Sequence, residues 1–424
     1  MDQVTTGREQ NWARNHTFAA ARIHRPGSID AVRRLVAASP KLHAIGTRHS
    51  FNDAADSPGE LVDLGGIDPD FRIDRDRMTV TVGAGTSYSA LARWLHGEGF
   101  ALHNLASLPH ISVAGAIATG THGSGDGNAA LSSAVCGFDL VTADGSLIHV
   151  ARGHEHFDAM VVGLGAFGVM TRVTLEIGPT FDVRQDAFVD LPWDALLANF
   201  DAISSCAYSV SILTKWSDPA VERIWLKTRL GTPPLEDLPI THLGLTPGPA
   251  FTAVLPGDDP ASRLNPFDGV PGPWSERLAH FRPDAIPGAE DQIQSEYMIS
   301  RPKLAEAVAG IRSMAGRIDP LLLITEIRTM AADRFWLSGA YGRDTIALHF
   351  TWAKQPEPVD AITRELEALL LPLGGRPHWG KLIHADAATL APLYERFSDF
   401  RACAAHYDPA GKFRNPYLER HVFG

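Results

Sequence analysis

Four polar side chains in two apolar stretches of the chain have the spacing of a binding or catalytic surface. Glu326 and Arg328 are two residues apart, and His349 and Thr351 are two apart in a later stretch. Side chains two apart on a strand project from one face of a sheet. A charged pair on an apolar strand is costly to bury unless it meets a partner or a polar ligand. The pattern therefore indicates either a salt bridge within a sheet or a polar site.

Two further polar residues are weaker candidates when taken alone. Lys381 follows a turn rich in Gly and Pro and could converge on the same face, although an isolated lysine more often lies on the surface. Gln294, in the sequence Gln-Ser-Glu-Tyr, is uninformative by itself.

The segment 106–125 has the composition of a backbone cradle. It is almost free of charge and rich in Gly, Ala, Ser and Thr. Few side chains would keep its backbone amides from a bulky polar group, such as a phosphate.

Three histidines, His49, His110 and His122, lie in loops of small residues. A zinc site would need close spacing of the His-Glu-x-x-His kind or cysteine pairs, and neither pattern is present. No Gly-x-Ser-x-Gly elbow for a serine nucleophile is present either. We therefore expect no metal, and a lone loop histidine is most simply a hydrogen-bonded structural residue.

The segment 163–168 matches the Gly-x-Gly-x-x-Gly fingerprint of dinucleotide-binding folds. That fingerprint requires a following helix, whose N-terminus faces the pyrophosphate. Residues 169–177 instead have the pattern of a strand, which argues against a nicotinamide site of this type.

The elements that must position these residues follow from periodicity and capping. The length of 424 residues favours two domains, and the apolar strands near 321–330 and 345–352, followed by amphipathic helices, suggest an α+β arrangement. The segment 231–275 holds ten of the 29 prolines, so we expect a long ordered loop there. The other predicted elements are a helix over 29–38 capped by Ser28, strands at 42–45, 79–82 and 169–177, a helix through Leu91 and Leu95, a hairpin turning at Asp144-Gly145, and helices opened by Pro302 and ended by Pro372.

Composition restricts the classes of partner. A net charge of -11 without a basic cluster argues against nucleic acid. The chain has three distant cysteines, no signal-like N-terminus and no apolar run of about 18 residues. We expect a cytoplasmic protein with no membrane partner. No heptad seam indicates an oligomer, so the oligomeric state stays open and a monomer is compatible with the sequence.

Several of these segments in combination resemble the vanillyl-alcohol oxidase family of flavoproteins. The FAD-binding half of that family is matched by the loop around His49, the segment 106–125, the segment 163–171 and the segment 408–416. The tetrapeptides starting at Gln294, Glu326, His349 and His378 look like those of the alditol oxidases within that family, of the xylitol or sorbitol oxidase type. The resemblance covers the chain from about residue 10 to its end.

The resemblance implies a division of the chain. Residues 1–180, completed by 376–424, would form a two-subdomain FAD-binding domain, and 181–375 a substrate-binding cap domain with a largely antiparallel sheet covered by helices. His49 matches the histidine that is bonded covalently to the flavin 8α carbon, and Ala106 a position near the flavin edge where a small side chain leaves room for O2. The positions that match cofactor contacts are Gly46, Thr47, Arg48, His49, Ser50, Phe51, Asn52, Ala106, Ser107, Ser112, Gly115, Thr119, Gly120, Thr121, His122, Met170 and Asn415.

The resemblance also implies oxidation of a terminal primary alcohol of a polyol to the aldose, by hydride transfer to FAD with O2 reduced to H2O2. Lys381 with Arg328 would activate the hydroxyl, and His349 is the alternative base. The implied substrate-binding residues are Ser107, Gln294, Glu326, Arg328, His349, Thr351 and Lys381. A sugar-lactone oxidase or dehydrogenase of the same fold is one alternative function, and a flavin-carrying binding protein without turnover is another.

Overall fold

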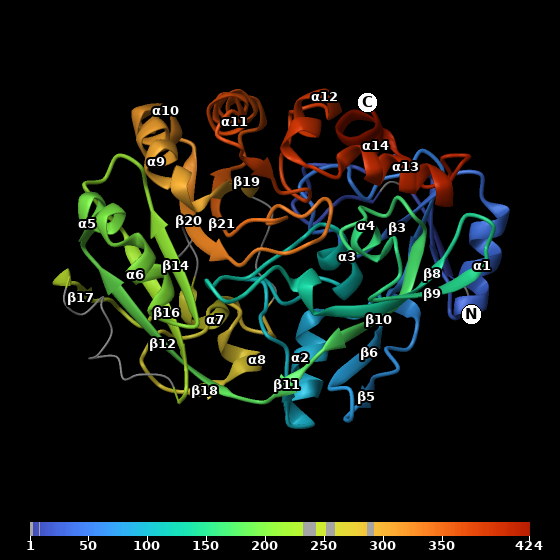
Figure 1. Cartoon of the computed structure of the whole chain (residues 1–424), viewed down its shortest axis with the longest axis horizontal. Helices are drawn as coiled ribbons and strands as arrows, with labels where there is room; N and C mark the ends of the chain where they lie inside the picture. The colour runs from blue at the N-terminus through green and yellow to red at the C-terminus, as the bar shows by residue number, and fades with distance from the viewer. Residues whose placement is uncertain (1–2, 8, 232–242, 252–258, 286–291) are drawn as a thin grey trace.

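Three β-sheets dominate the computed structural model, which describes residues 3–7, 9–231, 243–251, 259–285 and 292–424. Two smaller sheets lie in one half of the molecule and a large sheet lies in the other (Figure 1). Among the described residues, no helix combines the length and apolar character needed to cross a bilayer.

The first small sheet has the strand order β1-β2-β4-β3. Its strands are β1 (Gln3–Thr6), β2 (Arg22–Arg25), β3 (Leu42–Ile45) and β4 (Glu60–Asp63). Strands β2, β4 and β3 are parallel, and α1 (Ile29–Ala38) connects β2 to β3. The Ser28 hydroxyl accepts a hydrogen bond from the Ala31 amide, so the predicted cap and helix are confirmed.

The second sheet is antiparallel, in the order β5-β6-β10-β8-β9. Its strands are β5 (Arg72–Asp74), β6 (Thr79–Gly83), β8 (Val135–Val141), β9 (Leu147–Ala151) and β10 (Val169–Glu176), and its helices are α2 (Tyr88–Gly97), α3 (Val113–Ala118) and α4 (Phe157–Met160). Gly145 has a φ of 83° at the predicted hairpin turn. The segment 163–168 leads into β10, which confirms that no helix follows the glycines.

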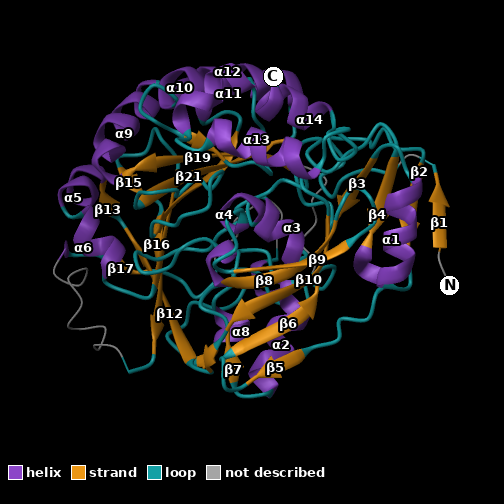
Figure 2. Ribbon diagram, turned by 45° about the vertical axis from the view of Figure 1, so that its right-hand side comes forward, coloured by secondary structure: helices purple, strands orange, loops and turns teal. Residues whose placement is uncertain are grey.

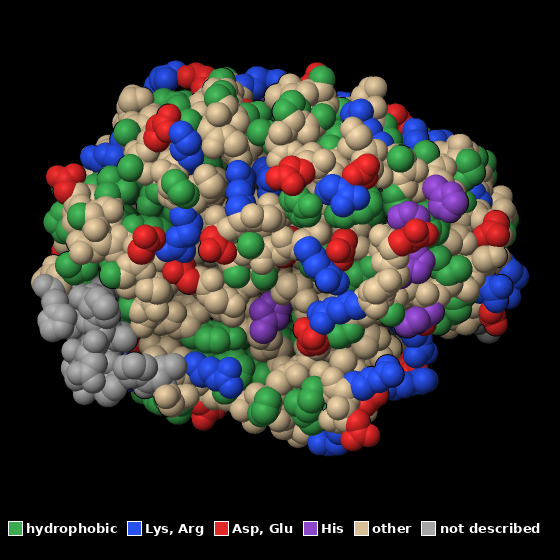
Figure 3. Space-filling view, viewed as in Figure 1, with side chains coloured by type: hydrophobic (Ala, Val, Ile, Leu, Met, Phe, Trp, Pro, Cys, Tyr) green, Lys and Arg blue, Asp and Glu red, His purple; other side chains and the backbone are tan. Residues whose placement is uncertain are grey.

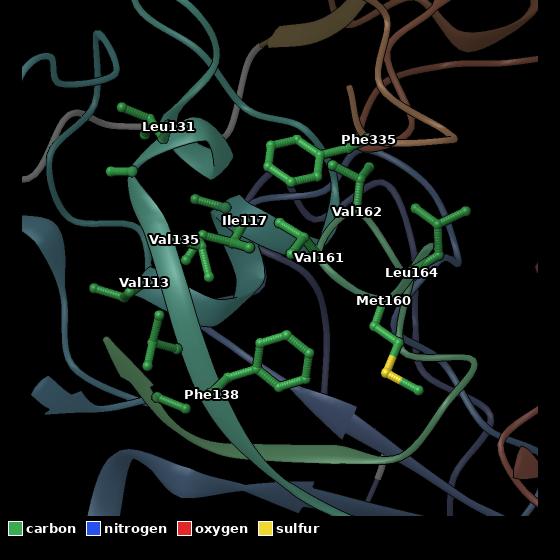
Figure 4. Close-up of a cluster of buried hydrophobic side chains, with 14 of the residues drawn as sticks. Val113, Ile117, Leu131, Val135, Phe138, Met160, Val161, Val162, Leu164 and Phe335 are labelled. Atoms are coloured by element: carbon green, nitrogen blue, oxygen red, sulfur yellow. The ribbon is translucent and has the colours of Figure 1, made fainter. Parts of the chain in front are cut away.

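A cluster of buried apolar side chains packs α3 against β8 (Figure 4). Val113 and Ile117 of α3 are fully buried and lie close to Val135 and Phe138 of β8. Burial of each such side chain contributes about 1.5–3 kcal/mol, so the start of α3 is held firmly in place.

The large sheet has nine strands, in the order β17-β12-β16-β14-β20-β21-β19-β22, with β18 paired to β12. Its neighbouring strands pair antiparallel, as predicted. The strands are β12 (Asp182–Val189), β14 (Ser209–Thr214), β16 (Arg223–Arg229), β17 (Thr246–Pro247), β18 (Gly272–Pro273), β19 (Gln292–Ser300), β20 (Leu322–Met330), β21 (Thr345–Ala353) and β22 (Arg376–Pro377).

Side chains of the large sheet alternate strictly between two environments. Ile327, Leu348 and Phe350 project into an apolar core beneath the helices that cover the outer face of the sheet (Figure 2). The covering helices are α5 (Trp193–Ala198), α6 (Phe200–Ser205), α9 (Leu304–Ser313), α10 (Ala315–Ile318) and α11 (Pro356–Leu370). The residues between them, such as Glu326 and His349, project to the opposite face, as the period of two predicts.

The Pro-rich segment 231–275 lies partly outside the described residues, at 232–242 and 252–258. Its described part is not all loop, because it holds β17, β18, α7 (Pro260–Arg263) and the start of α8 (Trp274–Arg277). The remaining described strands form two short two-stranded sheets. In one, β7 (Phe100–Ala101) pairs with β11 (Gly178–Pro179), and in the other, β13 (Leu191–Pro192) pairs with β15 (Ala220–Val221).

The C-terminal segment returns to the first two sheets. It contains α12 (Ala387–Leu390), α13 (Phe397–Tyr407) and α14 (Pro416–Leu418). The Leu42 amide donates to the Lys412 carbonyl, and Lys412 Nζ donates to the Ala143 carbonyl at 2.6 Å. These contacts support the predicted union of 1–180 with 376–424, whose boundaries stay a prediction.

Candidate active site

A cavity lies between the two halves of the molecule. Its volume is about 2180 Å³, which includes the space at its opening to solvent. One side, here called the cradle wall, is formed by residues 46–51, 106–122 and 163–170. The opposite side, here called the sheet wall, is formed by Gln294, Glu296, Glu326, Arg328, His349, Thr351 and Lys381. All the predicted substrate-binding residues line this cavity.

Glycines and other small residues of the cradle wall let backbone lie close to the cavity, beside larger side chains such as Phe51 and Met170. The Ser112 amide donates to Thr47 Oγ1 at 3.1 Å, which ties two of its loops together. A Cβ on Gly46 would lie 2.3 Å from Ser112 Oγ, and a Cβ on Gly115 would lie 2.7 Å from the same atom. A side chain at either glycine would therefore displace the Ser112 hydroxyl, so the small residues keep this part of the wall open.

The imidazole ring of His49, in the cradle wall, is electrically neutral. Burial, together with repulsion from His110 and Lys381, lowers the pKa of His49 to about 3. Its buried Nδ1 atom has no hydrogen-bond partner among the described residues, and the Trp12 ring lies 4.8 Å from its ring. Arg48 precedes it with a φ of 65°, a strained conformation for a residue with a Cβ. The ring is neutral, rigidly placed and free to form a bond.

Three of the predicted cofactor contacts do not line the cavity. Asn52 donates from Nδ2 to the carbonyls of Trp379 (2.8 Å) and Lys381 (2.7 Å), so it anchors the turn after β22 that carries Lys381. Asn415 caps α14 and donates to the Ala54 carbonyl at 2.9 Å. Gly120, with a φ of 66°, forms the turn after α3. Their predicted cofactor contacts stay predictions: in the structure, Asn52 and Asn415 bond to backbone carbonyls and Gly120 lies in a turn.

The other predicted cofactor contacts do line the cavity. They are Gly46, Thr47, Arg48, His49, Ser50, Phe51, Ala106, Ser107, Ser112, Gly115, Thr119, Thr121, His122 and Met170.

In the sheet wall, Arg328 lies between two buried carboxylates. Its Nη2 atom donates to Glu296 Oε1 at 2.7 Å, and its Nε atom is 3.8 Å from Glu326 Oε1. Burial opposes ionisation of all three groups. Attraction to His122 and Arg328 nevertheless holds the pKa of Glu296 well below the usual value, and attraction to Arg328 and His280 does the same for Glu326. The two carboxylates in turn raise the pKa of Arg328. Arg328 Nη1 also donates to Ser107 Oγ at 3.3 Å, across to the cradle wall. The sequence indicated either a salt bridge within a sheet or a polar site. The structure shows both, because the ion pairs of Arg328 line the cavity.

Glu296 was not predicted, although it shares a face of β19 with Gln294, two residues away. It lies 3.1 Å from His122 Nε2, and the His122 and His378 rings are 5.9 Å apart. The potential metal ligands of these three residues lie within 4.8 Å of one another. They come from three distant segments, so the search for closely spaced ligands could not have found them. Arg328, bonded to the same carboxylate oxygen, already supplies a positive charge there.

Contacts around Gln294 determine the protonation pattern of His349. The Lys381 ammonium group can only donate, so the Gln294 atom that it contacts must be the oxygen, Oε1. His349 Nε2 lies 3.0 Å from that oxygen and must donate as well. The lone pair of His349 is therefore on Nδ1, a buried atom without a partner among the described residues.

The pKa values fit this pattern. Burial, reinforced by Lys381 and Arg328, lowers the pKa of His349 to about 3, despite the nearby carboxylates. Burial also lowers the pKa of Lys381 to about 8. Below pH 8 the cavity therefore presents a cationic donor beside a neutral ring acceptor.

Two further buried residues, Lys227 and His280, touch this site and were not predicted. Lys227 follows the apolar residues Ile224, Trp225 and Leu226 in one strand. A lysine in such an apolar strand was the sequence signal that could have indicated a buried functional residue.

Comparisons with known proteins agree with this architecture. The sequence model of an FAD binding domain matches residues 20–151, and the model of D-arabinono-1,4-lactone oxidase matches residues 289–421. The chain is 42% identical to an alditol oxidase from Streptomyces sp., over 96% of this chain and 97% of that protein. It is 28% identical to the L-gulono-1,4-lactone dehydrogenase of Mycobacterium tuberculosis, over 97% of this chain and 98% of that protein.

A solved structure has the same fold. Cholesterol oxidase from B. sterolicum superimposes with a TM-score of 0.79 over 99% of this chain and 97% of that one, at 16% sequence identity. Together with the FAD binding domain match, this confirms the predicted α+β fold and FAD as the cofactor.

Proposed function

The chain belongs to the alditol oxidase family of FAD-dependent oxidases, of the vanillyl-alcohol oxidase type, and we propose that its cavity oxidises the terminal primary alcohol of an alditol such as xylitol or sorbitol. The product is the aldose, and O2 is reduced to H2O2. When bound, FAD supplies the hydride acceptor. The observation that carries the proposal is the sheet wall, where buried donors and acceptors alternate on one face of three adjacent strands.

The sheet wall suits a chain of hydroxyl groups. Glu326 and His349 Nδ1 can accept hydrogen bonds, whereas Arg328 and Lys381 can donate them. A ligand without hydroxyls would leave these buried groups unpaired, at a cost of about 1–3 kcal/mol each. This penalty favours a polyol over an apolar alcohol.

We assign the acid–base roles from the protonation pattern. Burial makes the His349 ring a weak base, so its Nδ1 atom accepts the proton of the reacting hydroxyl only as Lys381 and Arg328 donate to the hydroxyl oxygen and stabilise the negative charge that develops there. This exchanges the roles in the prediction that Lys381 with Arg328 activates the hydroxyl and His349 is the alternative base.

FAD fits the cradle wall, and we propose that it is bonded to His49. The neutral ring and unpartnered Nδ1 suit attack on the 8α carbon of the flavin. We expect the acid-precipitated polypeptide to stay yellow, and His49→Ala to lose this colour while still binding FAD. A white precipitate from the wild-type protein would exclude the covalent bond.

Anaerobic mixing with polyols tests the reaction. We expect xylitol or sorbitol to bleach the visible absorbance of the flavin, and admission of air to release peroxide equal to the polyol consumed. Bleaching by a sugar 1,4-lactone alone would favour the lactone oxidase alternative, to which residues 289–421 are similar. No bleaching by any of these compounds would contradict both functions and favour a flavin-carrying binding protein.

We also infer a reducing compartment for the protein, in agreement with the predicted cytoplasmic location. Cys136, Cys206 and Cys403 are all free thiols. Labelling of the three thiols in protein taken rapidly from cells tests this inference, since oxidised cysteines would contradict it.

On the face of the molecule drawn in Figure 3, acidic and basic side chains are interspersed.

A further inference from the structure

A row of buried polar groups reaches Glu326 from β16 and the segment that follows α8. Lys227 of β16 is 1% exposed, and Glu326 and His280, which follows α8, are each 7% exposed. Lys227 Nζ lies 3.1 Å from His280 Nδ1, and His280 Nε2 lies 2.7 Å from Glu326 Oε1. The row crosses the cavity face of the large sheet and ends in the proposed substrate site.

The partners of Lys227 determine the direction of these hydrogen bonds. An ammonium group has three donors and no acceptor. Lys227 Nζ contacts three acceptors, which are the Leu278 carbonyl, the Ala279 carbonyl at 3.1 Å and His280 Nδ1. His280 Nδ1 therefore accepts, its proton is on Nε2, and Nε2 donates to Glu326. The ammonium group thus selects the one neutral tautomer that stabilises an ionised Glu326.

Packing keeps the row in place. The Trp225 ring meets His280 edge-on at 4.9 Å, and the Lys227 ammonium lies 5.9 Å from the centre of the Phe267 ring. The His280 amide donates to the Ser107 carbonyl at 3.1 Å, which connects the row to the cradle wall. The imidazole therefore has little freedom to turn.

We propose that Lys227 and His280 are positioning residues that hold Glu326 ionised and aimed into the cavity, and thereby determine how tightly a polyol hydroxyl is bound. This inference rests on the proposed function of the site. Neither residue touches the substrate in this account, because both act through the Glu326 carboxylate. Loss of either should therefore weaken binding of the substrate more than it slows the chemical step.

The charges that face the row come from three elements. Arg277 of α8 and Arg328 of β20 repel Lys227, Glu326 attracts it, and His349 of β21 faces Glu326. Burial is the largest influence and lowers the pKa of Lys227 to about 7. As the pH rises through 7, the ammonium proton is lost and His280 can take the other tautomer, whose Nε2 lone pair would repel Glu326. We expect the KM for a polyol to rise over this range.

Steady-state kinetics of three variants and a control test the inference. Lys227→Met and His280→Leu should each raise the KM for xylitol or sorbitol about tenfold, with kcat changed less than about threefold. His280→Gln keeps an acceptor toward Lys227 and a donor toward Glu326, so its KM should stay within about threefold of wild type. Lys303→Met removes a lysine from an exposed pair with Glu306 and should change nothing. The rise in KM near pH 7 should disappear in Lys227→Met.

Nitrogen NMR of the histidine side chains gives a readout that is independent of turnover. The His280 signals, assigned by their loss in His280→Gln, should show an unprotonated Nδ1 and a protonated Nε2 at pH 6. A protonated Nδ1 at that pH, or unchanged KM in flavin-loaded Lys227→Met and His280→Leu, would overturn the inference. Should Lys227→Met fail to bind flavin, the contrast of His280→Leu with His280→Gln decides. A wild-type flavin that no polyol reduces would contradict the proposed function instead, and the NMR result would still test the row.

Discussion

The cradle wall is rich in glycines and small side chains, whereas the sheet wall presents charged and polar groups on strands β19, β20 and β21 and at Lys381, which follows β22. In the cradle wall, the loop segments can lie close to one another because Gly46 and Gly115 have no side chains that would contact the Ser112 hydroxyl. In the sheet wall, the buried Glu296 is kept ionised by His122 and Arg328, and the buried Arg328 lies between the carboxylates of Glu326 and Glu296.

This difference predicts opposite responses to substitution. A cradle of many amides shares its binding energy among many small contributions, so the loss of one side chain should matter little. A buried network of charges is interdependent, because removal of one member leaves the others desolvated and unpaired. Four substitutions test the contrast, in order of decreasing expected effect.

Arg328→Leu should have the largest effect, because it leaves Glu296 and Glu326 buried without their counterion. We expect kcat/KM to fall about 10²- to 10³-fold or more, and the free energy of unfolding to fall by about 3–5 kcal/mol. Steady-state kinetics and denaturant titration measure these changes. Arg172→Leu is the matched control, because its partner Asp70 lies at the surface, and it should change neither quantity measurably. Equal stability of the two variants would contradict interdependence in the sheet wall.

Lys381→Met removes a buried cationic donor and should lower kcat/KM about 10²-fold. The wild-type value should fall as the pH rises through about 8, because the lowered pKa of Lys381 means that its ammonium form is lost there. The decline near pH 8 should be absent from the pH profile of the variant, which should keep only the change near pH 7 that we assign to Lys227. Lys354→Met, which loses only a hydrogen bond to the Ala13 carbonyl, should keep the wild-type profile. A decline near pH 8 in Lys381→Met would assign it to another group.

Gly46→Ala tests the space in the cradle wall. Its Cβ would lie 2.3 Å from Ser112 Oγ, so the hydroxyl must move into the cavity, and FAD affinity should fall about tenfold. Affinity is measured in a His49→Ala background, where FAD can dissociate. Adding Ser112→Ala removes the obstructing oxygen and should restore affinity to within about threefold. If the double variant binds no better than Gly46→Ala, the effect is not steric.

Thr119→Ala should have the smallest effect, a change in FAD affinity of less than about threefold in the same background. The Thr119 hydroxyl is already bonded within the wall, to the Gly115 carbonyl at 3.1 Å and to Thr121 Oγ1 at 3.0 Å. A loss of tenfold or more would mean that this hydroxyl is an essential contact, and that the cradle wall depends on side chains as the sheet wall does.

Local patterns predicted most of the elements and one face of the site. The cap at Ser28, the turn at Gly145 and the alternation that places Glu326 and Arg328 on one face are all properties of neighbouring residues, and the structure confirms them. The FAD-binding fold and the family followed from the order of several short motifs, and the comparisons confirm both.

Partners that are distant in the chain could not be predicted in this way. Lys227 and His280 reach Glu326 only because the large sheet brings β16 and the segment after α8 to β20, and periodicity contains no information on such pairings. Asn415 was matched to a cofactor contact through a motif. In the structure its amide is occupied by the Ala54 and Asp56 carbonyls and it does not line the cavity, so that contact stays a prediction.

The return of the C-terminal segment also determines when the packing around the first sheet, whose strands lie within residues 3–63, can be completed during synthesis. The His43 ring bonds to the Phe413 carbonyl, 370 residues later, and Asn415 bonds to the Ala54 carbonyl, 361 residues later. At about 5–20 residues per second, a ribosome needs roughly 20 to 70 s to make the intervening chain. Strand β3 therefore emerges long before its final partners, and the closing contacts of the cofactor half form last, after the large sheet has been synthesised.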